Sequence, residues 1–293
     1  MHRPVMLDEV LGFLDLRPGD TVLDATLGGG GHSKEILKRI TPGGMLLGCD
    51  ADPAAIDRAR ENLRDFTGSF KLANGNFRYL NEMFDHEGLE KIDAALFDIG
   101  ISSYQMDEGA RGFSIKNPGP LDMRMDPRLK VSAKDLVNRL REEELSDIIK
   151  DLGEERFYRR IARAIVERRR EKKIETTEDL ASVVYRAVGG RYKRGRLDPA
   201  TRTFQAIRIA VNDELGALKD GLGQIVTRLN AGGRMAVISF HSLEDRIVKN
   251  KFKEYSAEGL IKILTKKPVR PTDAEVAENP RSRSGRLRVA ERI

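Results

Sequence analysis

Tryptophan is absent from this 293-residue chain, and Cys49 is its single cysteine. One thiol excludes an internal disulfide framework and any multi-cysteine zinc site, so we expect no metal centre and a reducing, intracellular compartment. Long apolar runs are also missing. No window approaches the ~20 apolar residues of a membrane helix, and the first residues lack the apolar core of a signal peptide. These absences predict a cytoplasmic protein without a membrane partner.

A large charge imbalance is missing as well. The chain has 52 Lys and Arg residues against 46 Asp and Glu residues, a net charge of +6 and a pI near 9.3. This mild excess is compatible with a polyanionic partner but does not require one, because charge of this size also serves solubility. The length suits one large or two ordinary domains, and no pattern in the sequence indicates an oligomeric state.

Short apolar runs alternate with helical patterns over the first hundred residues. Such alternation indicates βαβ units and a parallel sheet. From about residue 111 to 202 only helical patterns and loops remain, and a helix over about 199–229 then leads back to strands. We therefore predict a discontinuous α/β domain over residues 1–110 and 203–293, with an inserted helical domain over 111–202. The expected strands lie near residues 21–25, 45–49, 70–73, 92–97, 234–240, 261–264 and 287–290.

Four consecutive glycines, residues 28–31, follow the first expected strand. Glycines such as Gly28, Gly30 and Gly31 let the backbone pass close to a ligand without a Cβ clash. Asp50 ends the second expected strand, 20 residues after Gly30. A carboxylate at this place in nucleotide-binding α/β folds accepts the ribose hydroxyls. The pattern predicts an adenosine-type cofactor, and the alternative is a tight structural turn.

Asp24, which precedes the glycines, bears on the choice of cofactor. A dinucleotide fingerprint needs a third glycine where this chain has Ser33, and it holds a pyrophosphate at the helix N-terminus. Asp24 would repel a phosphate but attract an ammonium group. S-adenosylmethionine carries an ammonium, a sulfonium and no phosphate. We therefore predict S-adenosylmethionine rather than NAD, with Asn76 and Phe77 as candidate neighbours of its adenine; Phe77 is equally consistent with a core position.

Asp98 ends the fourth expected strand, at the edge where catalytic groups collect in folds of this kind. A carboxylate that accepts the N–H of an exocyclic amine restores the nucleophilicity of that amine during methyl transfer. Asp98 is therefore the candidate catalytic residue, and its alternatives are a cofactor contact or a turn cap. His32 and His241 are further candidate proton acceptors. Cys49 lies beside Asp50, so methylation of a ring carbon through a cysteine thiolate is disfavoured.

The insertion carries two basic clusters. Residues 154–173 contain nine basic and four acidic residues, and residues 191–196 add four basic residues and one tyrosine. Clustered Lys and Arg neutralise phosphates, and an aromatic residue among them stacks on an unpaired base. The alternative is a solvated helix face with a loop. A third basic candidate is residues 281–286. The candidate RNA-binding residues are Arg168, Arg169, Arg170, Arg191, Lys193, Arg194 and Arg196.

Several strings in order make the chain resemble the bacterial MraW-type methyltransferases, which methylate N4 of a cytidine in small-subunit ribosomal RNA. The resemblance covers nearly the whole chain and implies a Rossmann-like class I methyltransferase sheet with a helical insertion. Methylases of other amines carry two prolines and an aromatic residue after the strand-four acid, whereas Ile99-Gly100-Ile101 follows Asp98 here. The strings are residues 2–7 (HRPVML), 28–33 (GGGGHS), 98–103 (DIGISS), 111–114 (RGFS), 119–126 (GPLDMRMD), 201–206 (TRTFQA), 239–246 (SFHSLEDR) and 279–283 (NPRSR).

The resemblance also implies a substrate, 16S ribosomal RNA near the decoding centre of the small subunit. Two other functions remain open at this point. The first is a methyltransferase for a protein or small molecule, and the second is a non-catalytic RNA-binding assembly factor; a dehydrogenase is more distant still. For the cofactor site, the resemblance implies contacts from Gly30, Gly31, His32, Asp50, Phe77, Asp98 and Gln105.

Overall fold

Seven strands form one sheet in the order β3-β2-β1-β4-β5-β7-β6. The first five of these in space are parallel neighbours, whereas β7 is antiparallel to both β5 and β6. All seven expected strands are present, so the predicted α/β fold is confirmed in the computed structural model, which describes residues 4–189 and 198–293. The strands are β1 (Thr21–Asp24), β2 (Met45–Asp50), β3 (Phe70–Asn74), β4 (Ile92–Asp98), β5 (Leu229–Ser239), β6 (Ile261–Ile263) and β7 (Arg286–Arg292).

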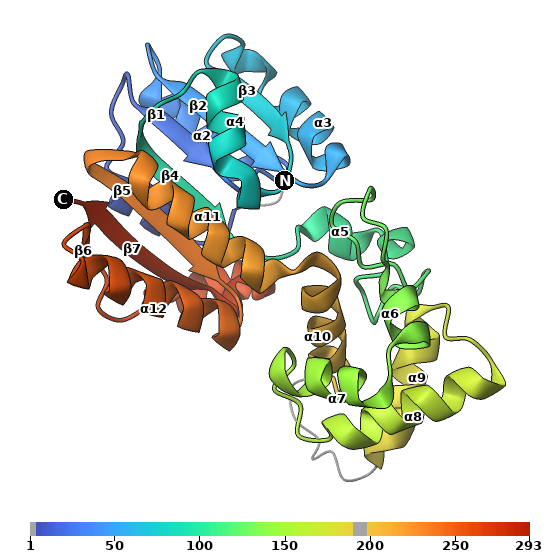
Figure 1. Ribbon diagram of the computed structural model, residues 1–293. Coiled ribbons are helices and arrows are strands. Elements are labelled where there is room, and N and C mark those ends of the chain that lie inside the picture. Colours follow the sequence, from blue (N-terminus) through green and yellow to red (C-terminus); the bar gives the residue numbers. More distant parts are fainter. Residues whose placement is uncertain (1–3, 190–197) are drawn as a thin grey trace. The chain divides into compact units, whose positions relative to one another are not determined.

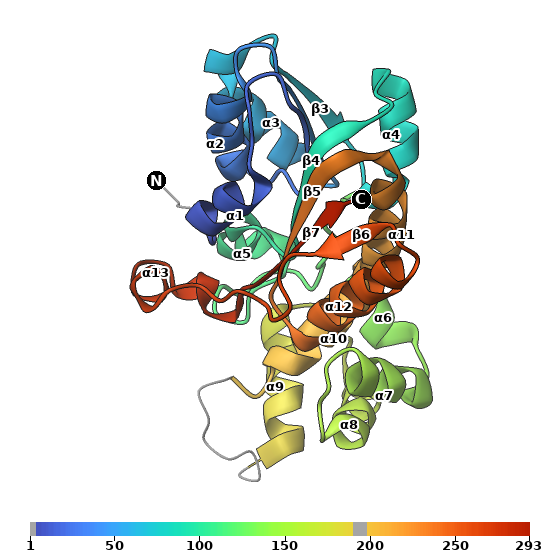
Figure 2. The same ribbon diagram turned by 90° about the vertical axis from the view of Figure 1, so that its left-hand side faces the viewer.

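Helices cover both faces of this sheet (Figures 1 and 2). Successive strand residues point to opposite faces, so Leu23 joins one buried cluster and Val22 joins the other. The first cluster includes residues of α4 (Leu80–Glu87), α11 (Glu214–Arg228) and α12 (Ser242–Ala257). The second includes residues of α1 (Leu7–Leu14), α2 (Gly31–Ile40) and α3 (Pro53–Asn62). The sheet is therefore buried on both faces, and its carboxyl edge is left for a site.

The start of α3 and several short helices of the sheet unit follow from local sequence signals or add to those predicted. α3 begins as its sequence indicates, because Asp52 accepts a hydrogen bond from the backbone N–H of Ala54 and Pro53 occupies the first turn. The long loop expected before the last strand contains a helix of its own, α13 (Asp273–Glu278), followed by the 3₁₀ helix η5 (Pro280–Ser284). Two further 3₁₀ helices are η1 (Arg64–Phe66) and η2 (Phe77–Tyr79).

The chain divides into two units. The sheet unit comprises residues 1–100 and 215–293, and the helical unit comprises residues 101–214. The predicted boundaries, 110/111 and 202/203, therefore both need correction. The single helix expected over 199–229 is also wrong, because Asp213 adopts a left-handed conformation (φ 45°) and ends α10 (Thr201–Asn212) before α11 begins. α10 packs against helices of the helical unit and so belongs there.

The helical unit has its own buried core, to which α6 to α10 contribute. The predicted absence of strands between 111 and 202 agrees with the described residues of this unit, where β pairing is limited to one bridge between Pro120 and Thr176. Its helices are α5 (Ser103–Asp107), the 3₁₀ helix η3 (Gly109–Arg111), α6 (Ala133–Arg139), α7 (Glu142–Asp151), α8 (Tyr158–Glu171), α9 (Thr177–Val188) and α10. None of the helices in the described parts of either unit is long and apolar enough to cross a membrane.

Asn212, at the end of α10, organises the loop that carries one of the family-like strings, residues 119–126. Its side-chain oxygen accepts a hydrogen bond from the Met125 N–H at 2.7 Å. Its amide donates to the carbonyls of Met123 at 2.8 Å and Arg208 at 2.9 Å. Within the same loop, Arg124 forms an ion pair with Asp122. These contacts show that the string folds a loop inside the helical unit.

Replacing Asn212 by alanine should lower the free energy of unfolding by roughly 2–4 kcal/mol, because buried backbone groups lose their partners. Denaturant titration of the purified protein measures this change. Asn117→Ala is the matched control, since Asn117 is exposed and its side chain makes one long bond, 3.4 Å, to the Met106 carbonyl. Equal unfolding midpoints for the two variants would contradict the role assigned to Asn212.

Candidate active site

The glycine loop joins β1 to α2 at the carboxyl edge of the sheet. Gly28 and Gly30 have φ values of +52° and +77°, a left-handed conformation that favours glycine. A Cβ at Gly28 would meet no atom within 4 Å, so open space lies beside this backbone. A Cβ at Gly31 would instead lie 2.9 Å from Cγ of Pro4. The loop is thus open on one side and packed under the N-terminal residues at its end.

Asp50, at the end of β2, is oriented toward this loop. Its Oδ2 accepts a hydrogen bond from the Gly28 N–H at 2.8 Å, and its Oδ1 accepts one from the Asp52 N–H at 2.9 Å. Burial raises the pKa of Asp50, and these two bonds oppose that rise. Each carboxylate oxygen keeps a further lone pair for a ligand hydroxyl. The geometry therefore suits the ribose contact expected for Asp50.

Asp24 lies at the end of β1 and is 1% exposed. Its Oδ2 accepts a hydrogen bond from the Ser33 hydroxyl at 2.6 Å, and its Oδ1 accepts one from the Thr26 N–H at 3.2 Å. Burial raises its pKa to about 6, against the lowering effect of these two bonds. Thr26 in turn accepts a hydrogen bond from the Asp98 N–H at 2.6 Å. The loop thus connects the ends of β1 and β4.

Asp98, at the end of β4, has a higher pKa than Asp24. Burial, followed by repulsion from Asp24, Glu244 and Glu275, raises its pKa to about 8. Its Oδ1 is buried and has no hydrogen-bond partner among the described residues. Its Oδ2 lies 3.7 Å from Nδ1 of His32. A buried carboxyl oxygen without a partner, close to a ligand-binding loop, is a candidate for contact with substrate or cofactor.

Cys49 and the adenine candidates have contacts of a structural kind. The Cys49 thiol is fully buried against the Ala25 carbonyl, and burial raises its pKa, so it is no accessible nucleophile. Asn76 caps η2 by accepting a hydrogen bond from the Arg78 N–H. The Phe77 ring packs edge-on against Phe97, with centroids 5.7 Å apart. The cofactor contact expected for Phe77 remains a prediction.

Gln105 and the basic candidates lie in the helical unit. Gln105 is buried and closes a capping box at the start of α5, in which its side chain accepts a hydrogen bond from the Ser102 N–H at 3.1 Å. Arg168 and Arg169 donate to the carbonyls of Lys172 and Val137, and burial lowers the pKa of Arg169. Arg170 is exposed. The other candidates, Arg191, Lys193, Arg194 and Arg196, lie outside the described residues.

Two carboxylates near Asp98 had no assigned role in the sequence. Glu244, 1% exposed at the start of α12, accepts hydrogen bonds from the N–H groups of Phe240 at 2.7 Å and His241 at 3.2 Å. Glu275 of α13 accepts one from the Met6 N–H at 2.7 Å. Both belong to segments far along the chain from β4. The family-like string at 239–246 contains Glu244, but it gives no sign of the electrostatic effect of Glu244 on Asp98.

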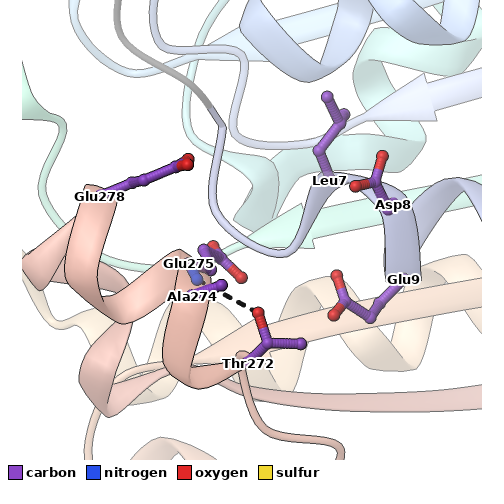
Figure 3. A pocket seen from close by; sticks show the side chains of 7 residues that line it. All are labelled: Leu7, Asp8, Glu9, Thr272, Ala274, Glu275 and Glu278. Atoms are coloured by element: carbon purple, nitrogen blue, oxygen red, sulfur yellow. Dashed lines mark hydrogen bonds between the residues drawn. The ribbon is translucent and has the colours of Figure 1, made fainter.

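A small acidic hollow lies between α1 and α13, as Figure 3 shows. The backbone N–H of Glu275 donates to the Thr272 hydroxyl at 3.1 Å in its wall. This hollow lacks the residues expected to bind the cofactor, and it is distinct from the glycine loop. Its lining residues are Leu7, Asp8, Glu9, Thr272, Ala274, Glu275 and Glu278.

The sheet with its reversed β7, the open glycine loop and the carboxylates after β1, β2 and β4 define a Rossmann-like methyltransferase. The whole chain, residues 1–293, matches the MraW methylase family, and it belongs to that family. The family consists of S-adenosylmethionine-dependent methyltransferases, so the predicted fold class and cofactor class are confirmed. Crowded carboxylates with raised pKa values fit a cofactor that carries a sulfonium and an ammonium group.

Curated relatives match the chain over its full length. It is 49% identical over 292 residues to "Ribosomal RNA small subunit methyltransferase H" of Persephonella marina, covering 100% of this chain and 99% of that protein. Proteins of the same name from Geobacter sulfurreducens and Clostridioides difficile are 48% and 44% identical, again covering 100% of this chain and 99% of each relative.

Asp98→Asn should stabilise the folded chain at high pH. The folded-state pKa of Asp98 is raised to about 8. Below about pH 4 the carboxyl is protonated in both the folded and the unfolded chain, so its burial costs little. As pH rises from about 4 toward 8 only the unfolded chain ionises, and the fold is increasingly destabilised. The gain should reach roughly 2–5 kcal/mol at about pH 8.5 and shrink toward pH 4. Denaturant midpoints measure it. Asp57→Asn, at a side chain 76% exposed, is the control, and a pH-independent difference for Asp98→Asn would contradict the prediction.

Binding of S-adenosylmethionine should release protons from Asp24 and Asp98. Its cationic groups favour the ionised carboxylates, so affinity should rise from about pH 5.5 to 7.5, by at most about tenfold per pH unit for each proton released. S-adenosylhomocysteine lacks the sulfonium charge and should show a shallower rise. Calorimetry in buffers of different ionisation enthalpy measures both the affinity and the proton release. Identical pH slopes for the two ligands would contradict this electrostatic account.

Proposed function

We propose that this chain transfers a methyl group from S-adenosylmethionine to the exocyclic N4 of a cytidine in 16S ribosomal RNA, near the decoding centre of the small subunit. The observation that carries the proposal is the group of carboxylates Asp24, Asp50 and Asp98 around an open glycine loop. The name shared by these relatives, which are 43–49% identical to this chain, supports small-subunit ribosomal RNA as the substrate.

The sheet unit would bind the cofactor through its own polar groups. Asp50 is aligned to accept the ribose hydroxyls, the glycine loop leaves room for the nucleoside, and Asp24 supplies negative charge for the ammonium group. Cofactor contacts from His32, Phe77, Asp98 and Gln105 complete the proposed set. When bound, S-adenosylmethionine supplies an electrophilic methyl group on a sulfonium.

Asp98 is proposed to act on the methyl acceptor. An exocyclic amine is a weak nucleophile because its lone pair is delocalised into the ring. The unpartnered Oδ1 of Asp98 is suited to accept an N–H of that amine and to take its proton as the new N–C bond forms. The target base must leave its stack to reach such a site, so an unpaired or flipped-out cytidine is the expected substrate.

The helical unit is proposed to recognise RNA. Along α8 and just beyond it, the exposed basic residues outnumber the exposed acidic ones, and Arg156 stacks over the Phe157 ring with 4.5 Å between guanidinium and ring centroid. Clustered cations of this kind bind phosphates. Arg168 and Arg169 are half-buried and bonded to carbonyls, which favours the exposed residues as the stronger contacts. These are Arg156, Arg159, Arg160, Arg163, Arg170, Lys172 and Lys173.

Methyl transfer to small subunits tests the proposal directly. Purified protein, labelled S-adenosylmethionine and small subunits from a strain lacking this methylation should yield labelled 16S RNA, and nucleoside mass spectrometry should identify N4-methylcytidine. Asp50→Ala should abolish cofactor binding and labelling together. Label on another base or atom would overturn the N4 assignment, and unlabelled RNA in the presence of bound cofactor would overturn the RNA substrate.

The Arg160→Ala/Arg170→Ala double variant should weaken RNA binding without changing cofactor affinity. Removal of two phosphate contacts should reduce the salt dependence of log K by about 1.4–1.8. Arg60→Ala is the matched control, because Arg60 is exposed on α3 and paired with Asp57. Filter binding at several salt concentrations gives the slopes. An unchanged slope in the double variant would remove α8 from the RNA interface.

A further inference from the structure

The residues just before α1, Pro4 to Met6, form a strap over the beginning of α2. Pro4 packs on Gly31, where no side chain would fit. The Val5 carbonyl lies 3.0 Å from Nε2 of His32. Met6 is fully buried, and its N–H donates to Glu275. The strap therefore ties the glycine loop to α13, and it belongs to a string, residues 2–7, to which the proposed function gives no role.

The strap determines the tautomer of His32. A carbonyl oxygen accepts hydrogen bonds and cannot donate one, so the contact with Val5 places the ring proton on Nε2. His32 is 7% exposed, and burial lowers its pKa to about 4. The ring is therefore neutral at physiological pH, and its Nδ1 carries a bare lone pair. Nδ1 is the ring atom that lies 3.7 Å from Oδ2 of Asp98.

The contact between His32 and Asp98 is not an ion pair. With a pKa of about 4 for the imidazole and about 8 for the carboxyl, both groups are neutral between these values. The other charged groups close to Asp98 are Asp24, Glu244 and Glu275, and all three oppose its ionisation. A neutral Nδ1 also opposes the ionisation of Asp98, because its lone pair accepts a hydrogen bond from a protonated carboxyl and repels an ionised one.

We propose that His32, held in one tautomer by the Val5 carbonyl, is a positioning residue that strengthens Asp98 as the base for the amine proton. This inference rests on the proposed function. The 3.7 Å separation exceeds hydrogen-bond length, and hydrogen bonds between catalytic groups often shorten only in the reacting complex. The strap thereby gains a chemical role in addition to its packing.

The atoms balance without another reactant. The lone pair of the substrate nitrogen forms the N–C bond as the methyl C–S bond breaks, and the electrons of that bond remain on sulfur. Asp98 is ionised in this complex, because binding of the cationic cofactor releases its proton, and its Oδ1 takes the extra proton from the nitrogen. A half-turn of the carboxyl group brings this proton beside Nδ1 of His32, which accepts its hydrogen bond. The proton leaves to solvent after the product departs, and His32 remains neutral throughout.

The pH dependence of methyl transfer distinguishes this role from a structural one. His32→Leu removes the acceptor, so Asp98 should become a weaker base. The acid limb of the kcat profile should move about one unit to lower pH, and kcat on its plateau should fall roughly threefold to tenfold. His32→Asn keeps an acceptor near the Nδ1 position and should restore part of both effects. His86→Leu, at a side chain 84% exposed on α4, is the matched control.

Calorimetry with S-adenosylhomocysteine shows whether each variant still folds and binds. A variant that binds normally but keeps the wild-type acid limb and plateau would overturn the role of His32. Wild-type protein that binds cofactor but methylates no small subunit would instead overturn the proposed function, and this inference with it. The two failures are thus distinguishable by the behaviour of the wild-type protein.

Nitrogen-15 NMR of histidine-labelled wild-type protein tests the tautomer without any substitution. Between about pH 5.5 and 8 the His32 signals should show a protonated Nε2 and an unprotonated Nδ1, with no titration, because burial keeps the ring neutral. His32→Leu assigns the signals by their loss. A ring protonated at Nδ1, or a doubly protonated ring in this range, would overturn the inference even if the variants proved unstable.

Discussion

Three carboxylates lie at the carboxyl edge of the sheet, and the cost of withdrawing their charge from water, to which repulsion between carboxylates adds, is the constraint on which the site depends. Within the described residues, Asp24, Asp50 and Asp98 form no ion pair with Lys or Arg; the bonds that Asp24 and Asp50 accept come from hydroxyl or backbone N–H groups. Glu244 and Glu275 add to the field at Asp98. Carboxylate charge that is withdrawn from water is costly when no ion pair offsets it, and the attraction of Arg58 for Asp50 opposes this cost only in part, so this edge favours a cationic ligand.

The surrounding chain holds these carboxylates close enough together to repel one another. Parallel β1, β2 and β4 bring three strand ends together, and backbone bonds from Gly28 and Asp52 keep Asp50 from turning away. The strap and α13 add a second layer, because Glu275 is bonded to the Met6 backbone. These contacts therefore lower the stability of the free protein at an edge where binding of a sulfonium cofactor would restore it, as is usual for functional sites.

Features that depend on residues close together in the sequence could be predicted. Buried strands and the glycine loop with its acids are short-range signals, and the structure brings Asp24, Asp50 and Asp98 together. The end of α10 at Asp213 could not be predicted, because the spacing of apolar residues does not reveal a left-handed backbone at one aspartate. The positions of Val5, Glu244 and Glu275 depend on contacts between distant segments. Phe77 shows that one sequence pattern fits two roles, because an aromatic residue after a strand can pack in the core or contact a ligand. In the structure its ring packs on Phe97.

The family-like strings divide into two physical kinds. Those at residues 28–33 and 98–103 begin at or near the carboxyl edge and contain its glycine loop and the proposed base, Asp98. The string at 119–126 instead folds a loop of the helical unit, where Arg111 donates to the carbonyls of Arg124 and Met125. A Cβ at Gly112 or Gly119 in this region would lie 2.2 or 1.9 Å from a backbone oxygen. The polar side chains of this string therefore satisfy backbone groups of the loop, and the groups proposed to act in methyl transfer lie in the sheet unit and its strap.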